Sequence, residues 1–98
     1  MIVEYRTKCL EKVYTKASTA VRQYGQEMAI RLHQRIKQIK AADNVEILVQ
    51  CHIGRCHQLH GDRDGQYAMD LVHPYRLVFT KHGDEIRIAR IEEIVDYH

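Results

Sequence analysis

The sequence has no tryptophan, one proline, one phenylalanine and only five glycines in 98 residues. These low counts exclude collagen-like and proline-rich linker sequences, and a hydrophobic content of 45% argues against a disordered chain. A chain of 98 residues is long enough for one domain with one core. We therefore predict a single domain over 1–98.

Long apolar runs are also missing. The first eight residues, M-I-V-E-Y-R-T-K, carry one acid and two bases, which is the pattern of neither a signal sequence nor a membrane span. The three cysteines, Cys9, Cys51 and Cys56, are odd in number and favour a reducing compartment over a disulfide framework. We expect a cytoplasmic protein with no membrane partner.

The net charge of +2 conceals an uneven distribution. Residues 1–42 contain nine Lys and Arg against three Glu, whereas residues 43–98 contain six Lys and Arg against ten Asp and Glu. A basic N-terminal half suits a polyanion such as nucleic acid. It is equally typical of a solvated helix surface.

Periodicity in the N-terminal half predicts a short strand at 2–6 and then two helices. A first helical repeat consists of Cys9, Leu10, Val13, Tyr14 and Ala17, and a second, longer stripe consists of Val21, Tyr24, Met28, Leu32, Ile36 and Ile39. Gly25 interrupts the second stripe at a cost of about 1 kcal/mol relative to Ala, so the helices divide near 23–25 in an alternative interpretation. Basic residues lie off the stripe: Arg22, Arg31, Arg35, Lys37 and Lys40.

The period changes to that of strands after residue 65. Apolar residues alternate with polar or small ones in Y-A-M-D-L-V, Y-R-L-V-F and E-I-R-I-A-R-I, with turns at H-P and at K-H-G-D-E. The last run slips phase near 90–91, which predicts a bulge. The predicted fold class is α+β in the order β-α-α-β-β-β, an antiparallel sheet with the two N-terminal helices packed on one face.

Residues 44–60 show no clear period, so we predict a loop with a short helical turn. The adjoining stretch C-H-I-G-R-C-H-Q-L-H-G-D-R-D-G contains possible metal ligands at Cys51, His52, Cys56, His57 and His60. It lacks C-x-x-C and H-x-x-x-H pairs, and no second cluster follows, so we expect no metal ion and no cofactor. G-D-R-D-G reads as a turn with Arg63 exposed.

Arg76 lies in the middle of the apolar run Y-R-L-V-F. A charge in a central strand needs either an opposite charge or an anionic ligand. Two interpretations stay open: an ion pair with Asp70 or Asp96, and a phosphate held by the planar guanidinium.

The sequence resembles the HigB-type toxins of the RelE/ParE superfamily, the toxic halves of bacterial type II toxin–antitoxin pairs. The resemblance rests on C-H-Q-L-H-G-D-R-D-G-Q-Y-A-M-D-L-V-H-P-Y-R-L-V-F, on the terminal I-V-D-Y-H and on Y-G-Q-E-M-A-I-R-L-H-Q-R-I. It implies a RelE-like small domain and a ribosome-dependent mRNA endonuclease. The implied catalytic residues are His57, Arg76, Asp96, Tyr97 and His98, with Arg76 neutralising the scissile phosphate.

The chemical requirements of RNA cleavage agree with these implied catalytic residues. RNA supplies its own nucleophile, the 2′-hydroxyl, so cleavage requires a proton acceptor, a proton donor and stabilisation of charge on phosphorus. Histidine suits both proton roles, and one placed acid or base is typically worth ~10²–10⁴ in rate. We expect the last strand to bring D-Y-H to an open edge of the sheet beside His57 and Arg76. The competing interpretation is a frayed end.

For RNA and ribosome binding, we predict the off-stripe bases Arg22, Arg31, Arg35, Lys37 and Lys40 together with His60 and Arg63. His60 stands where the resemblance implies Lys, which replaces a fixed charge with one that titrates near neutrality. The implied partners are the ribosome with its mRNA and a helix-turn-helix, HigA-like antitoxin, with operator DNA bound only through the antitoxin complex. Two alternatives remain: a ParE-like gyrase inhibitor, and a catalytically silent relic that binds its antitoxin.

Overall fold

The computed structural model describes residues 1–83 and 87–96, and these form an α+β fold. The strands are β1 (Ile2–Tyr5), β2 (His57–Gln58), β3 (Gln66–Asp70), β4 (Tyr75–His82) and β5 (Ile88–Asp96). The α-helices are α1 (Lys8–Thr15), α2 (Ala17–Tyr24), α3 (Gln26–Ala41) and α4 (Val45–Gln50), and two short 3-10 helices are η1 (Ile53–Arg55) and η2 (Gly61–Arg63). None of the helices in this part of the chain combines the length and apolar character needed to cross a bilayer.

The five strands form one sheet in the order β1-β5-β4-β3-β2. All neighbours are antiparallel except β1 and β5, which run parallel with Ile2 opposite Ile88. The prediction of an antiparallel sheet is therefore wrong for this pair. The α-helices connect β1 to the rest of the sheet, and such a crossover lets strands far apart in the sequence run parallel.

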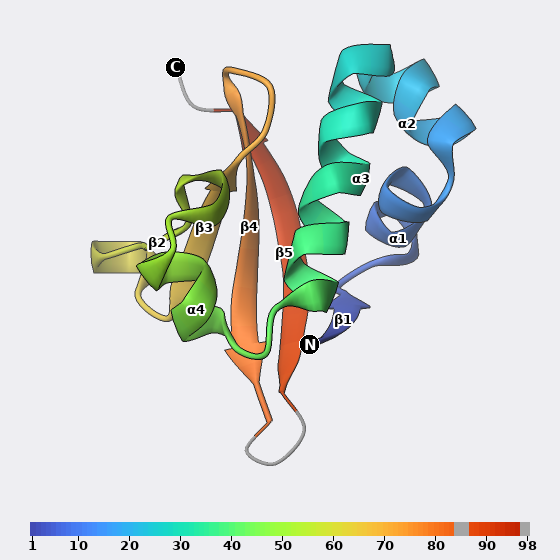
Figure 1. The fold of residues 1–98 in the computed structure, drawn as a ribbon. Helices are drawn as coiled ribbons and strands as arrows, with labels where there is room; N and C mark the ends of the chain where they lie inside the picture. The colour runs from blue at the N-terminus through green and yellow to red at the C-terminus, as the bar shows by residue number, and fades with distance from the viewer. Residues whose placement is uncertain (84–86, 97–98) are drawn as a thin grey trace.

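The helices cover one face of the sheet, and Figure 1 shows α3 lying along it with α1 and α2 beyond. Sheet residues on this face alternate with residues on the other, and Met69, Leu77, Phe79 and Ile91 are fully buried in one core cluster with the helices. The predicted packing of helices on a single face is confirmed. The opposite face, called the open face below, carries the intervening residues of β3 and β4.

The N-terminal half contains three helices rather than two. Gly25, with φ of +91°, separates α2 from α3, so the alternative division near 23–25 is confirmed. A single stripe from Val21 to Ile39 is wrong, because the break turns α2 away from the axis of α3. Val21 is consequently 43% exposed, whereas Ile39 is fully buried.

Residues 44–60 are more ordered than the predicted loop. The Asn44 side chain accepts from the amide of Ile47 at 2.9 Å, which begins α4, and Val45 and Leu48 enter the core. After η1 the chain forms β2, which contains only His57 and Gln58. The helix α4 confirms the predicted short helical turn, whereas η1 and β2 are too short to leave a recognisable period, so the sequence did not indicate them.

The predicted bulge in the last strand is present. Val78 lies opposite Glu93 and Phe79 lies opposite Ile91, so β5 has one extra residue, Glu92, between them. The predicted position, 90–91, was one to two residues early. The bulge resets the alternation so that Ile91 and Ile94 both contribute to the core side.

Candidate functional site

The open face brings together two of the predicted catalytic residues, His57 and Arg76. His57 lies opposite Ala68, and Arg76 lies opposite Asp70. Directly opposed residues share a face, and Ala68 and Asp70 are two apart on β3, so all four side chains emerge on the same side. Since β3 alone separates β2 from β4, the two backbones lie about 10 Å apart.

His57 is oriented by the chain that precedes it. Its Nδ1 lies 2.9 Å from the carbonyl oxygen of Arg55. The ring is half-buried on β2, the outermost strand of the sheet. A carbonyl oxygen only accepts hydrogen bonds, so this contact places a proton on Nδ1 and leaves the Nε2 of the neutral ring as an acceptor.

Arg76 makes an ion pair with Asp70, at 3.4 Å from Nε to Oδ1. The first interpretation of this buried-strand charge is thus confirmed with Asp70 as the partner. The other carboxylate oxygen of Asp70 lies 3.3 Å from the Nε of Arg55. One carboxylate therefore contacts two guanidinium groups, and the Arg76 side chain is 31% exposed.

Arg35 is a structural residue, and its predicted place among the exposed bases of the long helix is wrong. It is 8% exposed, and its Nε donates to the backbone oxygen of Asp70 at 2.7 Å while Nη1 donates to Gln38 at 3.0 Å. Burial and the neighbouring Arg31 lower the pKa of Arg35, and Asp70 raises it. Arg35 thus ties α3 to the end of β3.

The other predicted bases of α2 and α3 lie at or near the surface. Arg22, Lys37 and Lys40 are exposed, and Arg31 is half-buried. They belong to the helical layer, whereas His57 and Arg76 lie on the open face, so these bases are separate from the candidate catalytic residues. The contact with RNA or the ribosome that we predict for these bases would therefore use a second surface, on the helical layer.

Arg63 is held in place rather than freely exposed. Its Nη1 donates to Glu93 on β5 and to Gln66 at 3.1 Å. Because η2 precedes β3 and β4 lies between β3 and β5, the side chain reaches across the open face. His60 remains exposed, with Nδ1 4.0 Å from Asp64.

Asp96 is exposed at the end of β5, opposite Tyr75. Tyr97 and His98 lie outside the described residues. Only Ile88–Ile91 of β5 is paired with β1, so the C-terminal part of β5 borders β4 and approaches Arg76. His57 is on β2, three strands from β5, so the expectation that Asp96 lies beside His57 is wrong.

The cysteines and histidines between 51 and 60 do not gather at one point of the described structure. Cys56 is buried, and burial raises the pKa of its thiol to about 12, whereas Cys51 and His52 are exposed. Within 1–83 and 87–96, no three His, Cys, Asp or Glu side chains are grouped to hold a metal ion. Cys56 packs as a small apolar residue.

A pocket that sequence reasoning missed lies at the turn between β3 and β4. It has a volume of about 100 Å³ and is lined by Arg55, Asp70, His73, Tyr75 and Arg76, among others. In Figure 1 this turn is at the same end of the sheet as the end of β5. The available signal was the unusual C-H-I-G-R-C stretch, which contributes Arg55 to the lining of the pocket.

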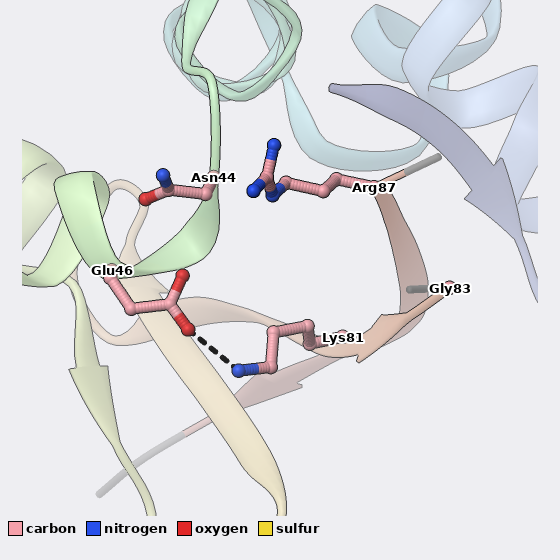
Figure 2. Close-up of a pocket in the computed structure, with 5 residues that line it drawn as sticks. All are labelled: Asn44, Glu46, Lys81, Gly83 and Arg87. Carbon is pink, nitrogen blue, oxygen red and sulfur yellow. Dashed lines mark hydrogen bonds and ion pairs between the residues drawn. The ribbon is translucent and has the colours of Figure 1, made fainter. Parts of the chain in front are cut away.

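A larger pocket, of about 480 Å³, lies between the start of α4 and the hairpin of β4 and β5. Figure 2 shows Glu46 and Lys81 pointing toward each other, joined at 2.6 Å, while Arg87 extends toward Asn44. The hydrogen bond from Lys81 lowers the pKa of Glu46. No residue predicted to be catalytic lines this pocket, so we regard the open face as the candidate site.

The sequence matches no protein-family model and no curated protein. Its structure is similar to a YoeB/ParE toxin from Agrobacterium tumefaciens, with a TM-score of 0.68 and 13% identity over 100% of both chains. It is also similar to a YoeB–YefM complex from Staphylococcus aureus, with a TM-score of 0.65 and 19% identity, covering 100% of this chain and 97% of that one. A YoeB dimer from the same organism gives a TM-score of 0.63 and 20% identity over the same shares.

These comparisons show a shared fold over the whole chain. The matched proteins are named YoeB or YoeB/ParE, so the general RelE/ParE-like fold is supported and the HigB type stays a prediction. Identities of 13% to 20% are too low to transfer an activity.

Proposed function

We propose that this chain is the toxin of a bacterial type II toxin–antitoxin pair and that it cleaves mRNA on the ribosome as an endoribonuclease. The observation that carries the proposal is the placement of His57 and Arg76 on one open face of the sheet. The fold shared with a YoeB/ParE toxin supports it independently. The HigB type is proposed on the sequence resemblance alone.

In the proposed reaction, Nε2 of His57 accepts the proton of the RNA 2′-hydroxyl. The 2′-oxygen attacks phosphorus, and the bond from phosphorus to the 5′-oxygen of the next nucleotide breaks. Arg76 stabilises the negative charge that develops on the phosphate oxygens. The products are a 2′,3′-cyclic phosphate and a 5′-hydroxyl, and no metal ion takes part.

The departing 5′-oxygen requires a proton, which we assign to the terminal D-Y-H segment. Asp96 lies opposite Tyr75 at the start of β4, next to the position of Arg76. His98 is the proposed donor, and Tyr97 is proposed to orient the phosphate or stack on a base. This assignment comes from the sequence, since 97–98 lie outside the described residues.

The proposed partners follow from the same assignment. A protein of similar fold is recorded in a YoeB–YefM complex, and we propose that a helix-turn-helix antitoxin covers this chain in a comparable way. The ribosome presents the mRNA, which places the activity in the cytoplasm. DNA is proposed to be bound only through the antitoxin.

The test is induced expression of the N-terminally tagged chain in a bacterial host, with growth measured and mRNA ends mapped on translating ribosomes. His57→Ala, Arg76→Ala and His98→Ala are compared with His33→Ala, a substitution of an exposed histidine on α3. Growth arrest with new mRNA ends is expected for the native chain and His33→Ala only. Arrest without cuts in all variants would favour a gyrase inhibitor, and no arrest would favour the relic.

A further inference from the structure

The edge strand β2 carries side chains on both faces of the sheet. Its two residues, His57 and Gln58, point to opposite faces because successive residues of a strand alternate. His57 lies on the open face, whereas Gln58 lies opposite Tyr67, whose ring packs against the core on the helical side. Since β2 ends the described sheet, a ligand can reach both of its faces around the outer edge.

A pocket of about 310 Å³ lies on the helical side of this edge. The strands line it with Gln58 and Tyr67, and α4 lines it with Glu46, Val49 and Gln50. Residues three and four apart share one side of a helix, and Figure 1 shows α4 beside β2 and β3. The volume is at the lower end of the range for small-molecule sites, roughly 300–1,000 Å³, which suits a single ring system.

Tyr67 gives the pocket an aromatic wall. Its ring stacks on the ring of Phe79, with a centroid separation of 5.6 Å and an interplanar angle of 21°. Phe79 is fully buried, so it covers one face of the Tyr67 ring and fixes the ring's orientation. A planar ligand in the pocket therefore meets an aromatic ring that is already held in place, which lowers the entropy cost of binding.

Glutamine and glutamate side chains supply the polar groups of the pocket. Gln50 and Gln58 are exposed, and each amide offers an acceptor oxygen and two donor hydrogens. The Glu46 carboxylate is oriented by Lys81, which donates to Oε1 at 2.6 Å, and Oε2 lies outside that bond. A carboxylate only accepts hydrogen bonds, so this group favours a ligand that carries an amino group.

The combination of ring, amides and carboxylate fits a nucleobase. Single-stranded RNA is recognised by stacking its bases on aromatic side chains and by hydrogen bonds to the base edges. Adenine, cytosine and guanine carry an exocyclic amino group that Glu46 can accept from, whereas uracil has none. A phenyl ring from a partner protein would stack on Tyr67 but would leave the amides and the carboxylate unused.

We propose that this pocket binds the base of a nucleotide next to the cleaved one. Tyr67 stacks on the base, and Gln50, Gln58 and Glu46 contact its edge. An RNA strand that passes around the edge of β2 presents its scissile phosphate to His57 on the open face and a neighbouring base to the pocket. This inference rests on the proposed function for the identity of the ligand, and it adds residues that select the base.

The first experiment titrates the four ribonucleosides into the purified chain, followed by amide NMR shifts. Nucleosides carry no phosphate, so attraction to the basic surface does not contribute. Shifts are expected at 46–50, 58 and 67, with uridine giving the weakest. Tyr67→Leu should remove them, and Tyr67→Phe, which keeps the ring, should retain them. Gln23→Ala, which changes an exposed glutamine of α2 outside the pocket, is the control for Gln58→Ala.

The second experiment uses an uncleavable RNA, an oligonucleotide with a 2′-deoxy residue at the cut position, in versions that vary the bases beside that residue. Gln58→Ala should weaken its binding by about fivefold, and Tyr67→Leu by about tenfold. In cleavage assays, Gln58→Ala should raise KM more than it lowers kcat and should change the base preference beside the cut. A loss of folding alone would leave that preference unchanged.

Three outcomes would count against the proposals. Equal nucleoside shifts and equal RNA affinities for the native chain, Gln58→Ala and Tyr67→Leu would overturn the base site. Shifts of the same residues with N-acetyltyrosinamide and with no nucleoside would overturn the base assignment in favour of a protein partner. Nucleoside binding that depends on Tyr67 in a chain that cuts no RNA would retain the base site and reject the endonuclease.

Discussion

The carbonyl oxygen of Arg55 lies 2.9 Å from Nδ1 of His57, two residues along the chain. Since a carbonyl cannot donate, the neutral ring carries its proton on Nδ1 and presents Nε2 as a base. The contact lies at the start of β2, so the backbone just before this edge strand also fixes the tautomer of the proposed base. This tautomer is why we propose His57 as the base, a choice that residue type alone left open between His57 and His98.

Replacing His57 should abolish most of the cleavage without unfolding the chain. If His57 is the base, His57→Ala should lower the single-turnover rate on programmed ribosomes by about 10²–10⁴. The ring is half-buried and outside the core cluster, so thermal unfolding should change little. A variant that cuts at the native rate would show that His57 is not the base. His33→Ala, which changes an exposed residue of α3, is the matched histidine control.

The close approach of Gly54 to the Arg35 side chain predicts that Gly54→Ala destabilises the fold, and Gly61→Ala serves as the control. Gly54 and Gly61 both have positive φ, at 59° and 70°, but a Cβ would meet Arg35 only at Gly54. Gly61→Ala should cost about 1–2 kcal/mol in free energy of unfolding from conformational strain, and Gly54→Ala about 1–3 kcal/mol more from overpacking.

Urea denaturation of the two glycine variants measures this difference. Equal losses would mean that Arg35 moves aside freely and does not hold the turn. If the turn is displaced by Gly54→Ala, RNA cleavage should fall in parallel, since Arg55 and His57 follow directly in the chain.

The sequence indicated the central strands because each is long enough to alternate. Met69 and Leu77 face the helices while Asp70 and Arg76 face the other side, as a period of two requires. The parallel pairing of β1 with β5 could not be predicted, because the sequence of a strand does not indicate the direction of the strand beside it. The break at Lys16 between α1 and α2 also lacked a glycine or proline to mark it.

The candidate site was predictable in part. His57 and Arg76 were singled out from the sequence, and strand register then placed them on one face. Asp70 was predicted as a partner of Arg76, but Arg55 was not assigned, because its contact with Asp70 depends on a left-handed turn that periodicity does not reveal. Arg35 was misplaced for a related reason: its helical position is near the edge of the apolar stripe, and Asp70 supplies a buried acceptor only in the fold.

Cys56 should be the least reactive of the three cysteines. Burial raises the pKa of its thiol to about 12, whereas Cys9 and Cys51 are exposed. Iodoacetamide at pH 8 should modify the two exposed cysteines first, as read by mass spectrometry. Because the folded pKa exceeds the unfolded one, near 9, the stability that Cys56 contributes should be lost as pH rises from about 9 to about 12. Rapid labelling of Cys56 in the native chain would contradict its burial.

The exposed bases of α2 and α3 should govern the salt dependence of RNA binding. Arg22, Lys37 and Lys40 are exposed, and each phosphate contact to a single strand contributes about 0.7 to the slope of log affinity against log salt. Replacing all three with Gln should therefore reduce the slope by about 2 if each contacts a phosphate. Fluorescence anisotropy with the uncleavable RNA, between roughly 50 and 200 mM salt, measures it.

The matched control for the helical bases removes the same number of charges from a neighbouring element. Lys8, Lys12 and Lys16 are also exposed but lie on or beside α1. A general effect of net charge would lower the slope equally in both triple variants, whereas a specific RNA surface on α2 and α3 lowers it only in the first. An unchanged slope in the first variant would mean that Arg22, Lys37 and Lys40 contact no RNA phosphate, because each such contact would have contributed to the slope.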